Sequence, residues 1–291
     1  MSPTLRPRRS ALYMPASNPR AVDKARGLDC DVVILDLEDA VLPEMKAEAR
    51  AAAVAAVAFG GFGGREVVVR VNGLDTPWGA EDLAAVSRAG PDAVLVPKVR
   101  GASDVRAYDQ ALQAAPDRTA LWVMIETVQV VFALDKVGEC AGDTRLAALV
   151  MGINDLAKEM RARQTPDRTP YHAALSLSVA AARSAGLVAL DGVHNEIEDL
   201  AALEAVCRQG VDFGFDGKTL IHPSHLSLTN QIFSPDGAEL AWSRAVIAAF
   251  ADPQNVGKGA LRVEGRLAER LHCDQAVALV ALAGAIAVRR N

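Results

Sequence analysis

The feature that most constrains this fold is a regular alternation of short apolar runs with segments of helical spacing. We identify eight runs, at residues 11–14, 32–35, 66–71, 93–96, 121–125, 146–151, 187–190 and 211–215. Alternating strands and helices predict a parallel sheet, and eight such units predict a closed (β/α)8 TIM barrel. An open doubly wound sheet usually carries a glycine-rich turn after its first strand, whereas residues 15–19 here read PASNP. We therefore expect the barrel.

The pattern changes after the last run. Residues 239–250 have helical spacing, 251–265 read as a loop, and 269–290 form a second helix that is apolar for most of its length. A helix that is apolar nearly all round must be buried. We expect a barrel over residues 1–232 and a C-terminal helical extension over 233–291. The extension would act as a lid and an oligomer contact, packed on its own barrel or on a neighbouring subunit.

Composition excludes several classes of protein. The net charge of -5 and the aromatic content of 4% argue against a nucleic-acid-binding surface. Four cysteines without a CxxC pair suit a reducing compartment. The basic N-terminus has no apolar stretch behind it, as a signal peptide would, and the uncharged run 276–288 is too short to span a bilayer. We expect a cytoplasmic protein that contacts neither nucleic acid nor membrane.

Polar residues follow nearly every apolar run, and in a barrel these positions converge on one mouth. Glu126 ends the run 120–125 and Asp155 follows the next run. An ionised carboxylate at a buried position needs a positive partner. Two carboxylates with open positions suit Mg²⁺, whereas zinc is disfavoured because neither acid has a His nearby. The alternative is a pair of solvated loop acids that form ion pairs with Lys158 or Arg70.

Arg70 lies near the end of its run and is expected to point into the mouth. Asp36, Glu38 and Asp39 form a dense acidic group whose natural partners are Arg70 and Lys98. Arg70 would then close the mouth as an ion pair, donate to a substrate carboxylate or developing oxyanion, or do both. The residues alone indicate a barrel enzyme, assisted by Mg²⁺, that acts on a small oxo acid or its ester.

Several motifs together carry a family resemblance. The segments ALYMPASNP, DVVILDLEDAVLPEMKAEAR, VVVRVNG, LVPKV, VMIET, LVMGINDLA and FDGKTLIHPSH resemble the citrate lyase beta-subunit-like family, which includes malyl-CoA, citramalyl-CoA and methylmalyl-CoA lyases. The resemblance covers about residues 9–250. It implies a (β/α)8 barrel, a homotrimer or homohexamer, that uses Mg²⁺ for reversible Claisen-type cleavage of a 3-hydroxyacyl-CoA. The products would be an acyl-CoA and a 2-oxo acid such as glyoxylate or pyruvate.

The same resemblance implies roles for individual residues. Glu126 and Asp155 become the Mg²⁺ ligands, and Arg70 becomes the oxyanion-stabilising residue, oriented by Asp36 and Glu38. The expected contacts to CoA come from the first barrel segment and from the segment after the last run, at Tyr13, Pro15, Arg20, Lys24 and His222.

The position of the catalytic base departs from the family pattern. Related lyases carry an Asp in a C-terminal segment resembling DGKMID, delivered to the mouth of a neighbouring subunit. Here the aligned residues 264–269 read EGRLAE, which places Glu269 at the position of that Asp. Glu269 is either the base or a helix N-terminal acid favoured by the helix dipole. The segment 191–199, DGVHNEIED, is also unusual for the family and leaves the substrate open.

Three functions follow from these residues. The first is the acyl-CoA lyase. The second is a malyl-CoA thioesterase on the same scaffold, in which an activated water attacks the thioester. The third is a non-catalytic subunit that binds an acyl thioester within a citrate lyase-like complex. The set Arg70, Glu126 and Asp155 argues against the third, and the sequence analysis places the lyase first.

Overall fold

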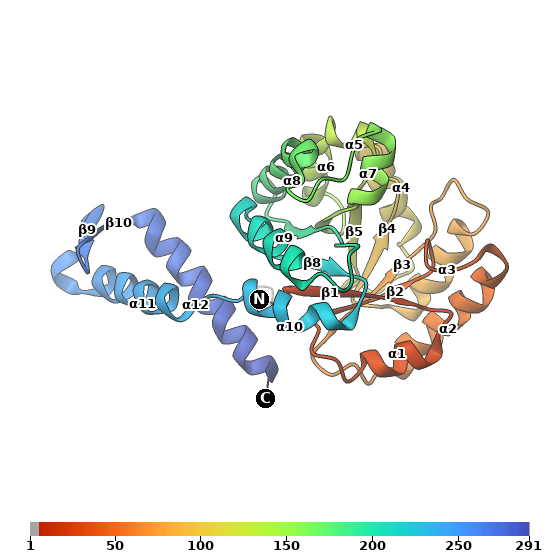
Figure 1. The fold of residues 1–291 in the computed structure, drawn as a ribbon, viewed down its shortest axis with the longest axis horizontal. Helices are drawn as coiled ribbons and strands as arrows, with labels where there is room; N and C mark the ends of the chain where they lie inside the picture. Colours follow the sequence, from red (N-terminus) through yellow and green to blue (C-terminus); the bar gives the residue numbers. More distant parts are fainter. Residues whose placement is uncertain (1–5, 291) are drawn as a thin grey trace. The chain divides into compact units, whose positions relative to one another are not determined.

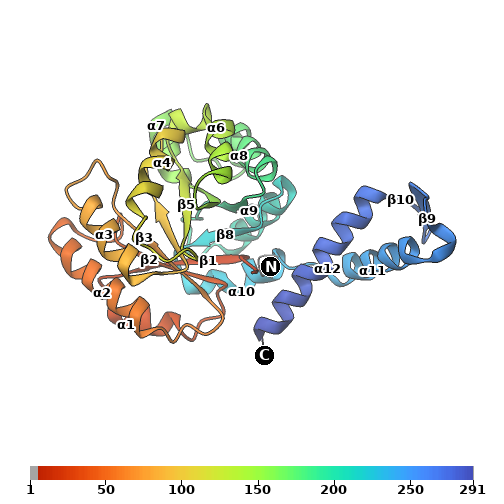
Figure 2. The ribbon, with the colours of Figure 1, turned by 180° about the vertical axis from the view of Figure 1, so that it is seen from behind.

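The computed structural model describes residues 6–290, which fall into two compact units. The first unit is Arg8–Phe233, and the second comprises residues 234–290 together with Arg6 and Pro7. Figure 1 shows the first unit with its strands in the centre and its helices around them, and Figure 2 shows it from behind. The two units are described separately below.

The first unit is a closed barrel of parallel strands, ordered β1 to β8 with β8 paired to β1. Its strands are β1 Ser10–Pro15, β2 Val32–Asp36, β3 Glu66–Arg70, β4 Ala93–Val96, β5 Ala120–Ile125, β6 Leu146–Met151, β7 Val188–Asp191 and β8 Gly217–Leu220. The predicted (β/α)8 barrel is therefore confirmed.

Helices connect consecutive strands and cover the outside of the barrel. They are α1 Pro19–Ala25, α2 Lys46–Phe59, α3 Gly79–Ala89, α4 Ala102–Ala111, α5 Val128–Val131, α6 Leu134–Glu139, α7 Ile153–Met160, α8 His172–Ser184, α9 Leu200–Phe213 and α10 Leu226–Ile232. Helix α1 begins with a capped first turn, because the Asn18 side chain accepts a hydrogen bond from the Ala21 N–H at 3.1 Å and Pro19 is the first helical residue.

Alternation along the strands fills the barrel. Ile34, Val68, Trp122 and Met124 belong to one buried cluster inside the barrel, whereas their strand neighbours belong to the cluster between sheet and helices. Side chains two residues apart on a strand point to the same side. The next inward positions at the carboxyl ends of β2, β3 and β5 are Asp36, Arg70 and Glu126, and all three line the cavity at the mouth.

The eighth strand was predicted at the wrong place. Residues 211–213 end helix α9, Gly214 follows it with a left-handed φ of 93°, and the strand is Gly217–Leu220. The prediction failed because it searched for an apolar run, whereas this strand carries Lys218 in its interior. Lys218 is buried with 0% exposure, and a nearby carboxylate, described below, makes that burial possible.

The second unit is a helical hairpin that carries a small antiparallel ribbon. Its elements are α11 Gly237–Ala251, β9 Ala260–Val263, β10 Arg266–Glu269 and α12 Arg270–Arg290. The loop predicted for residues 251–265 therefore contains a strand, and Glu269 ends a strand instead of beginning a helix. Glu264 and Gly265, both with positive φ, form the two-residue turn that favours such a ribbon. Periodicity missed it because each strand has only four residues.

Helix α12 is less buried than its composition predicts. Ala276 lies in a small core with Val246 of α11 and Ala268 of β10, but Val277 is 52% exposed and Val288 is 78% exposed. An 18-residue window within Arg270–Arg289 has a mean hydropathy of 1.7, so α12 is long and apolar enough to cross a membrane by length and composition. Core helices of other proteins meet the same criterion. The expectation that the protein does not contact a membrane was based on the uncharged run 276–288 alone, which is shorter than α12.

Candidate active site

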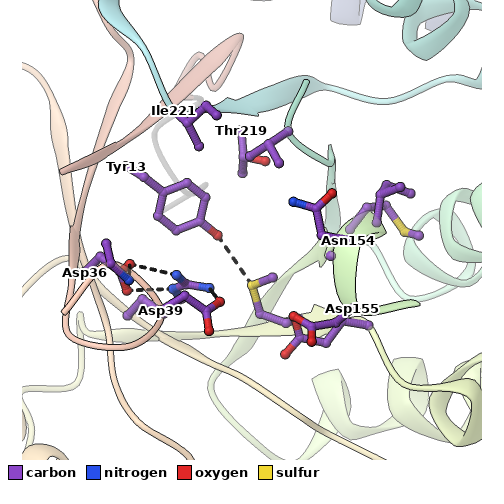
Figure 3. Close-up of a pocket in the computed structure, with 15 residues that line it drawn as sticks. Tyr13, Asp36, Asp39, Asn154, Asp155, Thr219 and Ile221 are labelled. Carbon is purple, nitrogen blue, oxygen red and sulfur yellow. Dashed lines mark hydrogen bonds and ion pairs between the residues drawn. The ribbon is translucent and has the colours of Figure 1, made fainter. Parts of the chain in front are cut away.

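A cavity of about 270 Å³ opens at the carboxyl ends of the barrel strands. Figure 3 shows that its lining combines acidic, amide and apolar side chains. The predicted residues Tyr13, Asp36, Arg70, Glu126 and Asp155 all line it. Ile221, of the segment after the last run that was expected to contact CoA, also lines it, and further lining residues that the sequence analysis did not single out include Met124, Asn154, Val193 and Thr219.

Arg70 is held by three carboxylates of the β2–α2 connection. Its Nε and Nη2 atoms donate to the two oxygens of Asp36, each at 2.7 Å. Its Nη1 atom lies 2.8 Å from Glu38 and 3.2 Å from Asp39. Burial by itself would lower the pKa of Arg70, but the neighbouring Asp36 carboxylate holds it well above the ordinary value. The guanidinium is therefore a permanent positive charge with a fixed orientation.

Glu38 shares that one guanidinium with two other acids. Burial raises the pKa of Glu38 from 4.5 to about 8, and Arg70 offsets only part of this rise. Because Asp36 takes both parallel hydrogen bonds from Arg70, a proton on Glu38 relieves the excess negative charge of the group. Glu38 thus changes charge near neutral pH.

Tyr13 covers Arg70 from the β1 side. The guanidinium carbon lies 4.8 Å from the centre of the Tyr13 ring, and the phenol donates to Met124 Sδ at 3.4 Å. Burial raises the pKa of Tyr13, so the phenol stays neutral. The neutral ring therefore packs on the guanidinium as a cation–π contact and covers one face of it.

Glu126 is buried, with its side chain 1% exposed. Its Oε1 atom accepts a hydrogen bond from the Lys98 backbone N–H at 2.8 Å, and Oε2 has no hydrogen-bond partner among the described residues. Burial raises the pKa of Glu126, and the nearby Lys98 ammonium lowers it in part. Gly152 makes room for this side chain, since a Cβ there would lie 2.5 Å from the Cβ of Glu126.

Asp155 lies in the first turn of α7, directly after β6. Its Oδ2 atom is 2.7 Å from Lys98 Nζ, which is also 3.3 Å from Glu126 Oε1. One ammonium thus bridges the two acids predicted to bind Mg²⁺. The sequence analysis considered Lys158 or Arg70 as their ion-pair partners and assigned Lys98 to the acidic group of the β2–α2 connection, so the observed pairing differs from both expectations.

The donor set fits a magnesium ion better than a zinc ion. Within residues 6–290, no cluster of three or more His, Cys, Asp or Glu side chains could hold a metal. Mg²⁺ commonly uses one or two carboxylates and fills its other positions with water and substrate oxygens. Glu126 and Asp155 supply two such groups at a cavity, and the unpartnered Oε2 of Glu126 is a buried acceptor in need of a cation.

Some residues predicted to contact CoA lie away from the cavity lining. Tyr13 and Pro15 belong to β1, with Tyr13 in the lining, whereas Arg20 and Lys24 are exposed on α1. His222 follows β8 and caps a short 3₁₀ turn. These roles stay predictions, as does that of Glu269, which belongs to the second unit.

Sequence reasoning missed a second buried charge cluster, beside the mouth. Asp191, at the end of β7, lies 2.7 Å from Arg168 and 3.1 Å from Lys218. Although burial opposes ionisation, these two cations hold the pKa of Asp191 below its ordinary value. A lysine inside a strand was the available signal, because a buried ammonium requires a carboxylate partner.

The fold and the site together are typical of (β/α)8 barrel enzymes. The strands form a closed parallel barrel, and its mouth carries paired carboxylates and a buried arginine. The chain belongs to the HpcH/HpaI aldolase/citrate lyase family, which matches residues 9–223. The family resemblance seen in the sequence is thereby confirmed.

Relatives of two reaction types match nearly the whole chain. A (3S)-malyl-CoA thioesterase of Cereibacter sphaeroides is 45% identical over 98% of this chain and 97% of its own. An L-malyl-CoA/beta-methylmalyl-CoA lyase of the same species is 32% identical over 96% of this chain and 95% of its own.

A solved relative carries the fold and ligands. The structure of CitE from Mycobacterium tuberculosis with magnesium, acetoacetate and coenzyme A is 28% identical. It covers 96% of this chain and 100% of its own, with a TM-score of 0.76.

These relatives correct the order of functions given by the sequence. The expected acyl-CoA lyase is wrong as the first choice, because four (3S)-malyl-CoA thioesterases are 43–45% identical over 97–98% of the chain. The lyases reach only 32%. The second of the three functions is the better supported one.

Proposed function

We propose that this protein hydrolyses a CoA thioester of the (3S)-malyl type, releasing malate and free CoA. The observation that carries the proposal is the extent of the likeness to the thioesterases, at 45% identity over 284 residues. That length includes the C-terminal unit, which lies beyond the residues matched by the family as a whole.

We further propose that the reaction depends on Mg²⁺ held by Glu126 and Asp155. Both carboxylates line the cavity, and their oxygens are the donor type that Mg²⁺ prefers. A bound Mg²⁺ would supply Lewis-acid polarisation and orient an oxygen-bearing substrate.

The chain's own residues supply the remaining electrostatics. In hydrolysis, water adds to the thioester carbonyl carbon, the carbon–sulfur bond breaks, and the CoA thiolate takes up a proton. Arg70 lines the cavity with a permanent positive charge and, although Asp36, Glu38 and Asp39 engage it, would serve as the donor to the oxygen that becomes negative. One well-placed donor of this kind lowers a barrier by about 3–4 kcal/mol. Asp36 keeps the guanidinium oriented, so the donor needs no rearrangement during the reaction.

The proposal is tested by following CoA release from (3S)-malyl-CoA with a thiol reagent. We expect release in the presence of Mg²⁺, loss of release in EDTA, and recovery when Mg²⁺ is restored. Acetyl-CoA, which lacks the malyl carboxylate and hydroxyl, serves as the matched control substrate and should be hydrolysed far more slowly. Release that is insensitive to EDTA would contradict the metal, and no release with Mg²⁺ would contradict the function.

A further inference from the structure

We propose that Lys98 is a built-in counter-cation that holds Glu126 and Asp155 in place without metal and leaves this position when a divalent cation binds. The inference rests on the proposed metal site and adds a role for a residue outside the predicted ligand set. Lys98 Nζ lies 2.7 Å from Asp155 Oδ2 and 3.3 Å from Glu126 Oε1. It thus contacts both acids at once, as the metal would.

The backbone of Lys98 is built for the same contact. The residue has a φ of 55°, in the left-handed region that a side chain other than glycine rarely adopts. In this conformation its N–H donates to Glu126 Oε1 at 2.8 Å. A strained backbone persists only where its surroundings impose it, and such positions gather at functional sites. One residue therefore fixes Glu126 through its main chain and pairs with it through its side chain.

Among the charged residues at the mouth, Lys98 is the one that balances the two carboxylates. Two carboxylates that share a site repel each other unless a cation stands between them. Arg70, the cation that lines the cavity, is engaged by Asp36, Glu38 and Asp39. Lys98 is therefore the cation that balances Glu126 and Asp155 in the described part of the chain.

The lysine side chain can also leave. Its ammonium nitrogen is buried between the acids, but it is carried on a flexible four-carbon stem and the side chain as a whole is 30% exposed, so movement of the stem can bring the ammonium to solvent. The hydrogen bond from the Lys98 backbone N–H to Glu126 Oε1 would stay in place when the lysine side chain moves. Mg²⁺ would then replace the Lys98 ammonium group between the two carboxylates. The free energy needed to displace that group would lower the affinity of the site for Mg²⁺.

The test measures Mg²⁺ binding and not activity. Lys98→Met keeps the length of the side chain and removes its charge. Isothermal titration with Mg²⁺ alone should show binding tighter than wild type by at least about tenfold, the factor expected when a competing charged hydrogen bond is removed. Unchanged or weaker binding would overturn the proposal. Lys158→Met is the matched control, since Lys158 is exposed on α7 three residues after Asp155, and its binding should equal wild type.

A measurement on the wild-type protein covers the case in which Lys98→Met fails to fold. Pulse labelling of lysines with acetic anhydride, read by peptide mass spectrometry, should modify Lys98 several-fold faster at saturating Mg²⁺ than in EDTA. Lys158 should be modified equally in both. Equal labelling of Lys98 in both states would overturn the exchange. Absence of any Mg²⁺ binding by the wild type would overturn the proposed metal site as well, whereas normal binding with no effect at Lys98 would overturn this inference alone.

Discussion

At Glu126, burial and charge act in opposite directions. Burial raises the pKa of this carboxyl, whereas the Lys98 ammonium and backbone N–H favour its ionised form. These contacts offset only part of the effect of burial, and one oxygen of the carboxyl remains without a partner among the described residues. Such a group is expected to gain more from a bound cation than a solvated acid would.

The first prediction is that Glu126→Gln loses Mg²⁺ binding. The amide keeps the shape of the side chain but supplies no charge, so CoA release should fall by at least about 100-fold. Titration with Mg²⁺ and the hydrolysis assay check both parts, and circular dichroism confirms that the fold is intact. Glu159→Gln, an exposed acid on α7, should behave as wild type. Wild-type hydrolysis in Glu126→Gln would refute the metal assignment.

A second prediction concerns Glu38 and pH. Burial raises its pKa from 4.5 to about 8, so the folded protein keeps a proton that the unfolded chain releases. The stability that this proton provides is complete below the unfolded pKa and is lost as pH rises toward the folded pKa. Over that window the free energy of unfolding should fall by up to about 1.4 kcal/mol per pH unit.

Glu38→Gln should remove this slope, because the amide carries no titrating proton. Urea denaturation in EDTA at several pH values between about 5 and 8 measures it for both proteins. The two slopes should differ over the whole window. Parallel curves would mean that Glu38 does not titrate there.

At the scale of elements, the end of β6 sets the position of the site. Gly152 links β6 to α7 and lies against the side chain of Glu126. Gly152→Ala would place a Cβ 2.6 Å from Glu126 Oε2, which the buried carboxylate cannot accommodate without moving. We expect a loss of stability of about 1–3 kcal/mol together with weaker Mg²⁺ binding.

Gly142→Ala is the matched control for that substitution. A Cβ at Gly142 meets nothing within 4 Å. Denaturation and Mg²⁺ titration of the two variants separate a local steric effect from a general effect of losing glycine. Equal behaviour of both variants would contradict the close packing of Gly152 on Glu126.

The barrel could be predicted because most of its strands are apolar runs. The prediction failed for the strand that is not an apolar run. β8 escaped detection because Lys218 and Thr219 lie inside it, satisfied by Asp191 of the neighbouring strand. The segment 211–215 looked like a strand because Val211, Phe213 and Phe215 alternate with Asp212 and Gly214. The C-terminal ribbon escaped because its strands are short and largely exposed.

The site could be predicted to the extent that it follows strand alternation. Asp36, Arg70 and Glu126 occupy inward positions at strand ends, and a count of two along each strand places them at the mouth. The bridging position of Lys98 does not follow from any period. It depends on one left-handed residue and on the reach of a long side chain.

At the scale of the whole molecule, the C-terminal unit carries Glu269, one of whose two predicted roles is the catalytic base. Glu269 is exposed at the end of β10 in this unit. If it serves as the base, Glu269→Gln should lower CoA release by about 100-fold, within the range typical of a lost general base, and leave Mg²⁺ binding unchanged. Glu264→Gln, in the turn of the same ribbon, should retain wild-type rates. Full activity of Glu269→Gln would show that Glu269 is not the base.

The motifs in the sequence identify the family but do not distinguish between the reactions of its members. The quoted motifs lie in the barrel, where the family match runs from residue 9 to 223. Paired carboxylates and a buried arginine can assist the hydrolysis of a thioester as well as the cleavage of a carbon–carbon bond. The distinction between thioesterase and lyase came from identity over the full length, 45% against 32%.

The most direct test of the central claim follows the oxygen atom of water. (3S)-Malyl-CoA is incubated with the protein and Mg²⁺ in ¹⁸O-labelled water, and the products are resolved by mass spectrometry. The account predicts free CoA and malate with one ¹⁸O in the carboxylate that formed the thioester, and no acetyl-CoA or glyoxylate. Acetyl-CoA and glyoxylate as the first products would contradict it.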